Sequence, residues 1–431
     1  MLSPYRRIFE APGSAAFSGA GLLSRMPLSM TGIGIVTMLS QMRGSYGLAG
    51  AVTAVLMISE AIFGPQISRL VDRFGQRRVA LPATAVSLAG LAGLLVCARW
   101  EAPDWTLFAT AVPVGCMPTF GSMVRARWAH IYADDPQRLH TAYSFESVAD
   151  ELCFIAGPIL AVGLSTAVLP EAGPLLSGAF LAVGAVLFCT QRRTEPPIRP
   201  ADGRPHRSAI RSPGLRVLML TFAATGAVFG AIDVVTVAYA EDAGHKGLAS
   251  LALAVYAAGS CLAGIAFGMI EPRGSAHRRF LIGVAGMALS LVPLLFAGNL
   301  AWVAAALFLA GMSVAPTMVT TMSLVAGFVP ARQLNEGMSW TITGLALGVA
   351  AGSSIGGAVV DAHGAAAGYG VPVAAGALAA LTALAGLRHL RAAPHASPHG
   401  QIGPDAASPQ VRADIQRADD GNRTRVISLE D

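Results

Sequence analysis

Charge is scarce in this sequence, and lysine is almost absent. Only 13% of the 431 residues are charged and 54% are hydrophobic, whereas soluble domains carry roughly 25% charged residues. A soluble chain of this composition would expose more apolar surface than water tolerates. The composition therefore predicts an integral membrane protein.

Motifs that hold nucleotides or metals are also missing. A P-loop needs Gly-Lys-Ser/Thr, but the single lysine, Lys246, is followed by Gly247 and Leu248. The sequence contains no His-Glu-x-x-His and no Cys-x-x-Cys. Its 5 cysteines all fall inside apolar runs, where cysteine acts as a small core residue. We therefore expect no ATP hydrolysis, no enzyme activity, no cofactor and no metal site.

Apolar runs of membrane-spanning length fill the rest of the chain. About 20 apolar residues cross a bilayer, and twelve runs meet this criterion. They cover residues 15–40, 47–67, 79–98, 105–124, 143–168, 172–190, 214–239, 247–270, 280–297, 300–327, 334–360 and 366–387. The sequence therefore predicts an all-α protein with twelve transmembrane helices in contact with the lipid bilayer.

The distribution of basic residues predicts the topology. Of the 30 Lys and Arg residues, only Arg43, Arg99 and Lys246 fall in one set of alternate links, and Arg25 lies inside the first span. Because cytoplasmic links retain positive charge, we expect both termini in the cytoplasm. The preference for arginine, with abundant alanine and glycine, suggests a GC-rich bacterial genome and hence a bacterial cytoplasmic membrane. The net charge of +5 lies in these links, so we expect no nucleic-acid partner.

The two halves of the chain match each other weakly. At an offset of 200, Gly64, Arg73 and Arg78 lie over Gly264, Arg273 and Arg278. The predicted organisation is a cytoplasmic N-terminus (1–14), a six-helix bundle (15–190), an Arg- and Pro-rich cytoplasmic linker (191–213), a second six-helix bundle (214–390) and a disordered tail (391–431). We expect a monomer.

The link between the second and third spans, residues 68–78, carries the most specific pattern. Taken alone, it could be a plain basic loop that sets topology. Its order, however, resembles the Gly-x-Leu-Ala-Asp-Arg-Phe-Gly-Arg-Arg signature of the major facilitator superfamily. The matching residues are Leu70, Asp72, Arg73, Phe74, Gly75, Arg77 and Arg78, while Ser68 replaces the first glycine and Gln76 stands where arginine is common. The resemblance implies a transporter of small molecules whose bundles rock about a midplane site, with Asp72 and Arg73 holding one closed state.

Ionisable residues inside the spans are candidates for function because they are costly in lipid. Arg25 in the first span requires an anion: a protein carboxylate in an ion pair, or the substrate, unless its side chain reaches the interface. Glu60 in the second span could carry a proton or pair with Arg25. Asp233 lies in the seventh span, and the resemblance implies that this span faces the central cavity. There Asp233 would bind a cationic substrate or carry a proton, unless it is only a buried, hydrogen-bonded residue.

The fifth span carries three acidic residues. Glu146 and Asp150 are four residues apart and share a helix face, whereas Glu151 is turned away from it. They could form structural ion pairs with Arg125, Arg127 and Arg138 of the preceding link. They are also compatible with the cytoplasmic gating network that the resemblance implies.

The same span continues with Gly157 and Pro158. These residues partly match the superfamily's fifth-helix Gly-x-x-x-Gly-Pro-x-x-Gly-Gly signature, which is associated with antiporters, and small residues let helices pack closely. The superfamily's fourth-helix arginine, linked to proton coupling, has no counterpart in residues 112–124. We expect proton-coupled efflux, with proton-coupled uptake or a non-transporting receptor or scaffold as alternatives.

Overall fold

The computed structural model describes residues 3–198, 208–245, 248–271 and 274–391, and these residues form helices joined by turns, with no strand among them. Residues Met1–Pro394 form one compact unit. The predicted disordered tail lies outside the described residues except for Arg391, as do residues 199–207 of the predicted linker. Lys246 and Arg273, which belong to the predicted links, also lie outside them.

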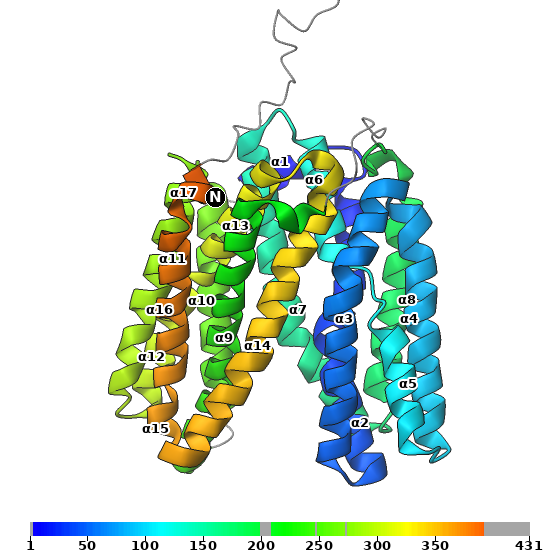
Figure 1. The fold of residues 1–431 in the computed structure, drawn as a ribbon, viewed down its shortest axis with the longest axis vertical. Helices are drawn as coiled ribbons and strands as arrows, with labels where there is room; N and C mark the ends of the chain where they lie inside the picture. Colours follow the sequence, from blue (N-terminus) through cyan, green and yellow to red (C-terminus); the bar gives the residue numbers. More distant parts are fainter. Residues whose placement is uncertain (1–2, 199–207, 246–247, 272–273, 392–431) are drawn as a thin grey trace, which may run out of the picture. The chain divides into compact units, whose positions relative to one another are not determined.

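The helices follow one another with short connections in both halves of the chain (Figure 1). The first half contains α1 (Ser3–Ile8), α2 (Ser14–Arg43), α3 (Tyr46–Phe74), α4 (Gln76–Arg99), α5 (Asp104–Val114), α6 (Phe120–Ile131), α7 (Pro136–Ala167) and α8 (Ala172–Thr190). The second half contains α9 (Pro213–Asp242), α10 (Ala249–Met269), α11 (Ala276–Leu291), α12 (Leu300–Gly311), α13 (Val314–Phe328), α14 (Leu334–His363), α15 (Ala365–Gly368), α16 (Gly370–Ala385) and α17 (Leu387–Arg391). Short 3₁₀ turns are η1 (Arg192–Thr194), η2 (Ala209–Arg211), η4 (Val292–Phe296) and η5 (Ala331–Gln333).

The fourth predicted span is interrupted. Among the described residues, 11 helical stretches are long and apolar enough to cross a membrane, and α5 with α6 supplies the remaining span in two pieces. Pro118 lies between the pieces and cannot donate a backbone hydrogen bond. Gly115 lies so close to α3 that a Cβ there would be 2.7 Å from the backbone nitrogen of Glu60. The all-α, twelve-span prediction is therefore confirmed, with one span broken.

The predicted end of this span is wrong. We expected it to end at residue 124, with Arg125 and Arg127 in the following link, but α6 continues to Ile131 and contains both arginines. Both side chains are buried. The sequence rule failed because it treated two nearby arginines as the end of a membrane segment, whereas partners inside the bundle satisfy these charges.

Glycine allows α9 and α14 to approach each other closely. Gly344, Gly348 and Gly352 recur at every fourth residue of α14, and the last two face Ala223 and Ala227 of α9. A Cβ at Gly348 would meet the carbonyl oxygen of Ala223. This small-residue spacing supports close packing where lipid supplies no hydrophobic driving force between helices.

Large apolar side chains cover the outer surfaces of the helices. Ile159 on α7, Leu289 on α11 and Leu381 on α16 are 67%, 71% and 63% exposed. Such an apolar exterior would favour aggregation in water. It fits contact with lipid chains, as the composition predicts.

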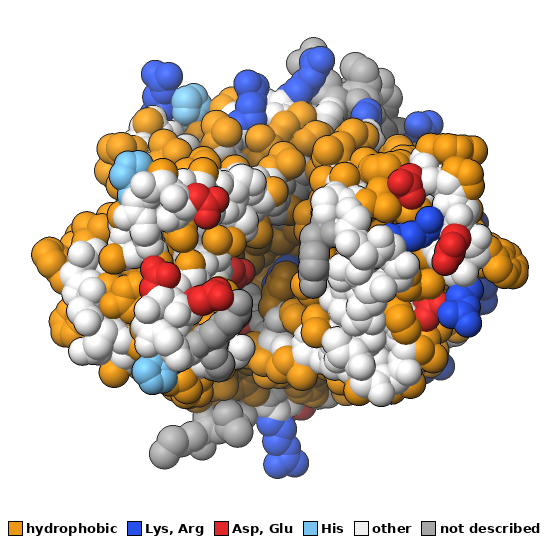
Figure 2. Space-filling view, turned by 90° about the horizontal axis from the view of Figure 1, so that it is seen from below, with side chains coloured by type: hydrophobic (Ala, Val, Ile, Leu, Met, Phe, Trp, Pro, Cys, Tyr) orange, Lys and Arg blue, Asp and Glu red, His pale blue; other side chains and the backbone are white. Residues whose placement is uncertain are grey.

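The two halves meet mainly at one end. Contacts across them join α3 with α14, α7 with α10 and α13, and α1 with α10. Figure 1 shows α3 and α14 converging toward the end at which α1 lies and diverging at the other end. Seen from that other end, the surface has a hollow between two lobes (Figure 2). We call the closed end the α1 end and the hollow the central hollow.

Candidate functional site

The turn between α3 and α4 carries the sequence motif and lies at the α1 end. Gly75 separates the helices with a φ of 92°, a conformation that favours glycine. Ser68 is buried, which allows close packing, whereas Leu70 is exposed. The guanidinium of Arg73 lies 5.0 Å from the centre of the Phe74 ring. The turn therefore exposes most of its charge and leaves Asp72 to face the second half.

Asp72 binds the first turn of α14 in the second half. Its carboxylate accepts hydrogen bonds from the backbone nitrogens of Asn335 and Glu336, at 3.2 and 2.8 Å, and from Nδ2 of Asn335 at 2.7 Å. The residue before α14, Gln333, supplies no side-chain cap. Asp72 thus pairs N–H groups that a helix start leaves free, and its negative charge suits the positive end of the helix.

A second contact between the halves uses carbonyl groups near the end of α10. Donors from the first half reach these oxygens in three places. Tyr5 Oη donates to Gly264 and Ile265 at 3.2 and 2.9 Å, Thr141 Oγ1 donates to Gly268 at 2.8 Å, and His140 Nε2 lies 2.9 Å from the oxygen of Phe267. Burial raises the pKa of Tyr5 to about 12, so its hydroxyl keeps the proton it donates at neutral pH.

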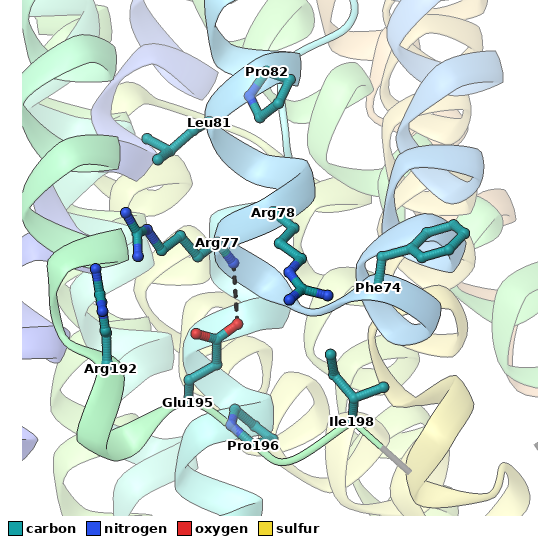
Figure 3. Close-up of a pocket in the computed structure, with 9 residues that line it drawn as sticks. All are labelled: Phe74, Arg77, Arg78, Leu81, Pro82, Arg192, Glu195, Pro196 and Ile198. Carbon is teal, nitrogen blue, oxygen red and sulfur yellow. Dashed lines mark hydrogen bonds between the residues drawn. The ribbon is translucent and has the colours of Figure 1, made fainter. Parts of the chain in front are cut away.

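Two glutamates attach the link between the halves to the helix bundles. Glu336, buried at the start of α14, accepts hydrogen bonds from Ser208 Oγ and, at 3.0 Å, from the backbone nitrogen of Ala209. Glu195, near the other end of the link, accepts from the backbone nitrogen of Arg77 at 3.1 Å (Figure 3). The link is therefore attached to α4 in one half and to α14 in the other.

The predicted charges of the first and fifth spans form one buried cluster. Arg25 pairs with Glu146 at 2.6 Å and with Asp150 at 2.7 Å, and Arg125 pairs with the second oxygen of Asp150 at 2.7 Å. Two positive and two negative charges thus compensate one another. Glu146 also accepts hydrogen bonds from Ser18 Oγ and Trp128 Nε1, at 2.8 and 2.7 Å. Such pairing with opposite charge is what a buried charge requires.

The cluster decides between alternatives that the sequence left open. Arg25 makes a protein ion pair, with Glu146 and Asp150 and not with Glu60. Of the three arginines considered as partners for the fifth-span carboxylates, Arg125 alone pairs with one. Arg138 instead lies beside Glu10 and Asp135, at 3.5 and 3.3 Å.

Arg127 binds partners other than the carboxylates considered from the sequence. Its guanidinium donates to Gln76 Oε1 and Thr194 Oγ1, each at 2.8 Å, and to the carbonyl oxygens of Gln191 and Phe188. Gln76 is the motif residue that stands where arginine is common. A neutral amide at this position accepts a hydrogen bond from Arg127 without adding charge. The glutamine at a position where arginine is common was the feature of the sequence that could have indicated this contact.

Glu60 lines a cavity of about 240 Å³ in the first half. Its lining also includes Pro27 of α2 and Pro158 of α7. Gly157, next to Pro158, packs against α2, where a Cβ would lie 3.0 Å from Cβ of Ser29. The second and fifth spans therefore place one carboxyl and the Gly157–Pro158 pair near the same helix, α2.

Asp233 on α9 is exposed rather than buried. Tyr256 of α10 lies within electrostatic range of both Asp233 and Glu151. Glu151 Oε1 accepts a hydrogen bond from Ser260 Oγ at 2.7 Å, which joins α7 to α10. Two carboxyl groups from different halves therefore both act electrostatically on one tyrosine, and a positive charge in this region would be attracted.

In the described part of the chain, no three or more His, Cys, Asp and Glu side chains form a cluster able to hold a metal ion. The 5 cysteines are free thiols.

Comparisons with known proteins agree with this architecture. A family model for the Major Facilitator Superfamily matches residues 17–333 and 245–417. A comparison with curated proteins gives no match. Among solved structures, a bacterial homologue of the iron transporter ferroportin in an outward-facing state is 16% identical with a TM-score of 0.70, covering 87% of this chain and 99% of that one.

Two further structures are similar at the level of the fold. The human organic anion transporter MFSD10 (TETRAN) is 16% identical with a TM-score of 0.66, covering 86% of this chain and 98% of that one. The Major Facilitator Superfamily transporter FucP in the outward conformation is 13% identical with a TM-score of 0.67, covering 87% and 99%. With the family match extending over most of the sequence, the chain belongs to the major facilitator superfamily.

Proposed function

We propose that this protein is a secondary active transporter that moves a small molecule by alternating access between its two bundles, residues 15–190 and 214–390. The Asp72 contact with α14 carries the proposal. It joins the two halves through a single charged side chain at the α1 end, while the other end has the central hollow (Figure 2). A contact that is strong but small is suited to breaking and re-forming as the halves rock.

The α1 end is proposed to face the cytoplasm. The exposed arginines of the α3–α4 turn lie there, and basic residues are retained on the cytoplasmic side. Both termini would then be cytoplasmic, the bilayer would be a bacterial cytoplasmic membrane, and the present state would be open to the outside. The protein would act as a monomer, without a nucleic-acid partner.

The substrate or proton site is proposed to include Asp233, with Glu151 and Tyr256 beside it. None of the salt bridges among the described residues involves Asp233, Glu151 or Glu60. Carboxyl groups that are not paired with arginine inside a membrane protein are suited to carrying protons or binding cations. This contrasts with Glu146 and Asp150, which the arginines of the buried cluster neutralise.

The proposed direction is proton-coupled efflux. The Gly157–Pro158 pair supports it through the antiporter-like fifth-span pattern. Proton-coupled uptake is the competing direction, because a structurally similar protein is described as a fucose:proton symporter.

The test is accumulation of a panel of fluorescent compounds in cells that express the parent protein, Asp72→Asn or Asp233→Asn, each with and without a proton uncoupler. Asp242→Asn is the matched control for Asp233, because it changes an exposed aspartate at the far end of the same helix. Efflux predicts lower accumulation with the parent, reversed by the uncoupler and by both test variants but unchanged by the control. Higher accumulation would establish uptake, and no difference for any compound would favour a receptor.

A further inference from the structure

A pocket of about 610 Å³ lies outside the proposed transport path, where α3, α4 and the start of the link meet (Figure 3). Arg77, Arg78 and Arg192 line it together with Glu195. Its volume falls in the range of small-molecule sites, about 300–1,000 Å³. Arg77 and Arg78 belong to the sequence motif, but the Asp72 contact with α14 does not use their side chains.

The pocket has an excess of positive charge. Three guanidinium groups face it, and Glu195 is the one acidic residue that lines it. That carboxylate accepts a hydrogen bond from the backbone nitrogen of Arg77. Arg77 and Arg78 are exposed, and no salt bridge among the described residues uses either of them or Arg192. The pocket is therefore suited to an anion with several acceptor oxygens, such as a phosphate group.

An apolar surface leads from this pocket along α4 toward the membrane interior. Arg78, Pro82 and Val86 are spaced four residues apart, so they share one helix face, and all three are exposed. Val96, further along the helix, is also an exposed apolar residue. Phe74, Leu81 and Ile198 add apolar atoms to the pocket wall. A ligand bound here would meet positive charge at one end and an apolar surface next to it.

We propose that this pocket binds the headgroup of an anionic phospholipid, with the acyl chains lying along the exposed face of α4. The arginines bind the phosphate oxygens, and Pro82 and Val86 contact the chains. A soluble phosphate compound would use the arginines alone and would leave the adjoining apolar surface to other lipids. Because Glu195 belongs to the link and binds α4, the lipid would contact the link and the α3–α4 turn together.

The proposal is tested on the purified full-length protein in detergent. Phosphatidylglycerol and phosphatidylcholine with identical acyl chains are titrated separately, and bound lipids are counted by native mass spectrometry. Glycerol phosphate serves as the soluble headgroup without chains. The test variant combines Arg77→Gln, Arg78→Gln and Arg192→Gln. The control combines Arg7→Gln, Arg211→Gln and Arg216→Gln, which removes equal charge from exposed residues that do not line the pocket.

We expect one phosphatidylglycerol molecule to bind at least tenfold more tightly than phosphatidylcholine. A basic residue near an anionic membrane surface raises lipid affinity roughly fivefold, so three such contacts correspond to about a hundredfold in affinity. The test variant should lose this factor. The control should bind like the parent. Arg192→Gln alone, which leaves α4 unchanged, should lose roughly fivefold even if the triple variant folds poorly.

Three results would overturn the proposal. Equal binding of phosphatidylcholine would remove the need for negative charge. Binding of glycerol phosphate as tight as that of the lipid would make the pocket a site for soluble anions. An equal loss in the control variant would show that overall charge, and not this pocket, attracts the lipid. None of these results depends on the transported substrate, so the proposed function would be unaffected.

Discussion

Replacing Asp72 by asparagine should weaken the contact that closes the α1 end. The carboxylate accepts three hydrogen bonds from the first turn of α14. Asparagine offers one acceptor oxygen, and its amide would point N–H groups at backbone donors. Hydrogen bonds to a charged group contribute about 1.5–3 kcal/mol and neutral ones about 0.5–1.5 kcal/mol. The loss of charge and of one bond amounts to about 3 kcal/mol, or about a hundredfold in the closed-to-open ratio.

The opening is measured by electron–electron distances between spin labels. In a cysteine-free background, labels at Arg78→Cys and Arg216→Cys report the α1 end, where both residues are exposed in opposite halves. Labels at Trp100→Cys and Asp242→Cys report the other end. Asp72→Asn should add a longer distance at the α1 end and a shorter one at the other end, because the two halves move as bodies.

Asp135→Asn is the matched control for this substitution. Asp135 also binds a helix start at the α1 end, accepting from the backbone nitrogen of Arg138 at 2.9 Å, but both residues belong to the first half. The control should leave both distance distributions unchanged. If Asp72→Asn also leaves them unchanged, or if the control shifts them equally, the assignment of Asp72 as the contact between the halves is refuted.

Three further predictions follow from the other contacts. Tyr5→Phe removes the donor to Gly264 and Ile265 and should raise the open-to-closed ratio of the α1 end severalfold, as measured by the same distances. The pKa of Tyr5 is raised to about 12, above the usual value near 10. The stabilisation by Tyr5 should therefore be constant from pH 6 to 9 and disappear only between about pH 10 and 12. Arg25→Gln leaves the buried Glu146 without its ion pair and should cost about 3–5 kcal/mol in thermal unfolding. Arg99→Gln removes an exposed guanidinium that lies 3.8 Å from Glu171 and should cost at most about 1 kcal/mol; equal losses would contradict the buried cluster. Gly348→Ala should lower the unfolding temperature because the new methyl group would contact Ala223, at a cost of about 1–3 kcal/mol. Gly286→Ala on α11 should not lower it, because a Cβ there would meet nothing within 4 Å. Equal unfolding temperatures of the two variants would mean that α9 and α14 do not pack as closely as described.

The sequence predicted the fold well because its signals are local. Span lengths follow from runs of apolar residues, and the turn around Gly75 follows from a motif contained in a short stretch. The error in the fourth span has a physical cause, since Arg127 is buried against Gln76, Thr194 and two carbonyl oxygens. A window of hydropathy counts such an arginine as exposed charge and ends the span too early.

The site could be predicted only in part, because its partners are distant in the sequence. The motif identified Asp72, but nothing near it indicates that its partner is the start of α14, at Asn335 and Glu336. The helical spacing of Glu146 and Asp150 correctly placed them on one face, yet it could not choose between Arg25 and the arginines of the preceding link. Such choices depend on tertiary packing, which local periodicity does not encode.

The most direct test of alternating access is a reversible cross-link across the α1 end. Thr119 Oγ1 of the first half lies 3.3 Å from Ser339 Oγ of the second half, so cysteines at these positions should form a disulfide in the closed state. In a cysteine-free background, Thr119→Cys with Ser339→Cys is assayed with a compound whose accumulation the parent protein changes. The account predicts that transport stops under oxidation and resumes after reduction, while each single cysteine variant transports in both conditions. Transport at the parent's rate with the disulfide fully formed would contradict it.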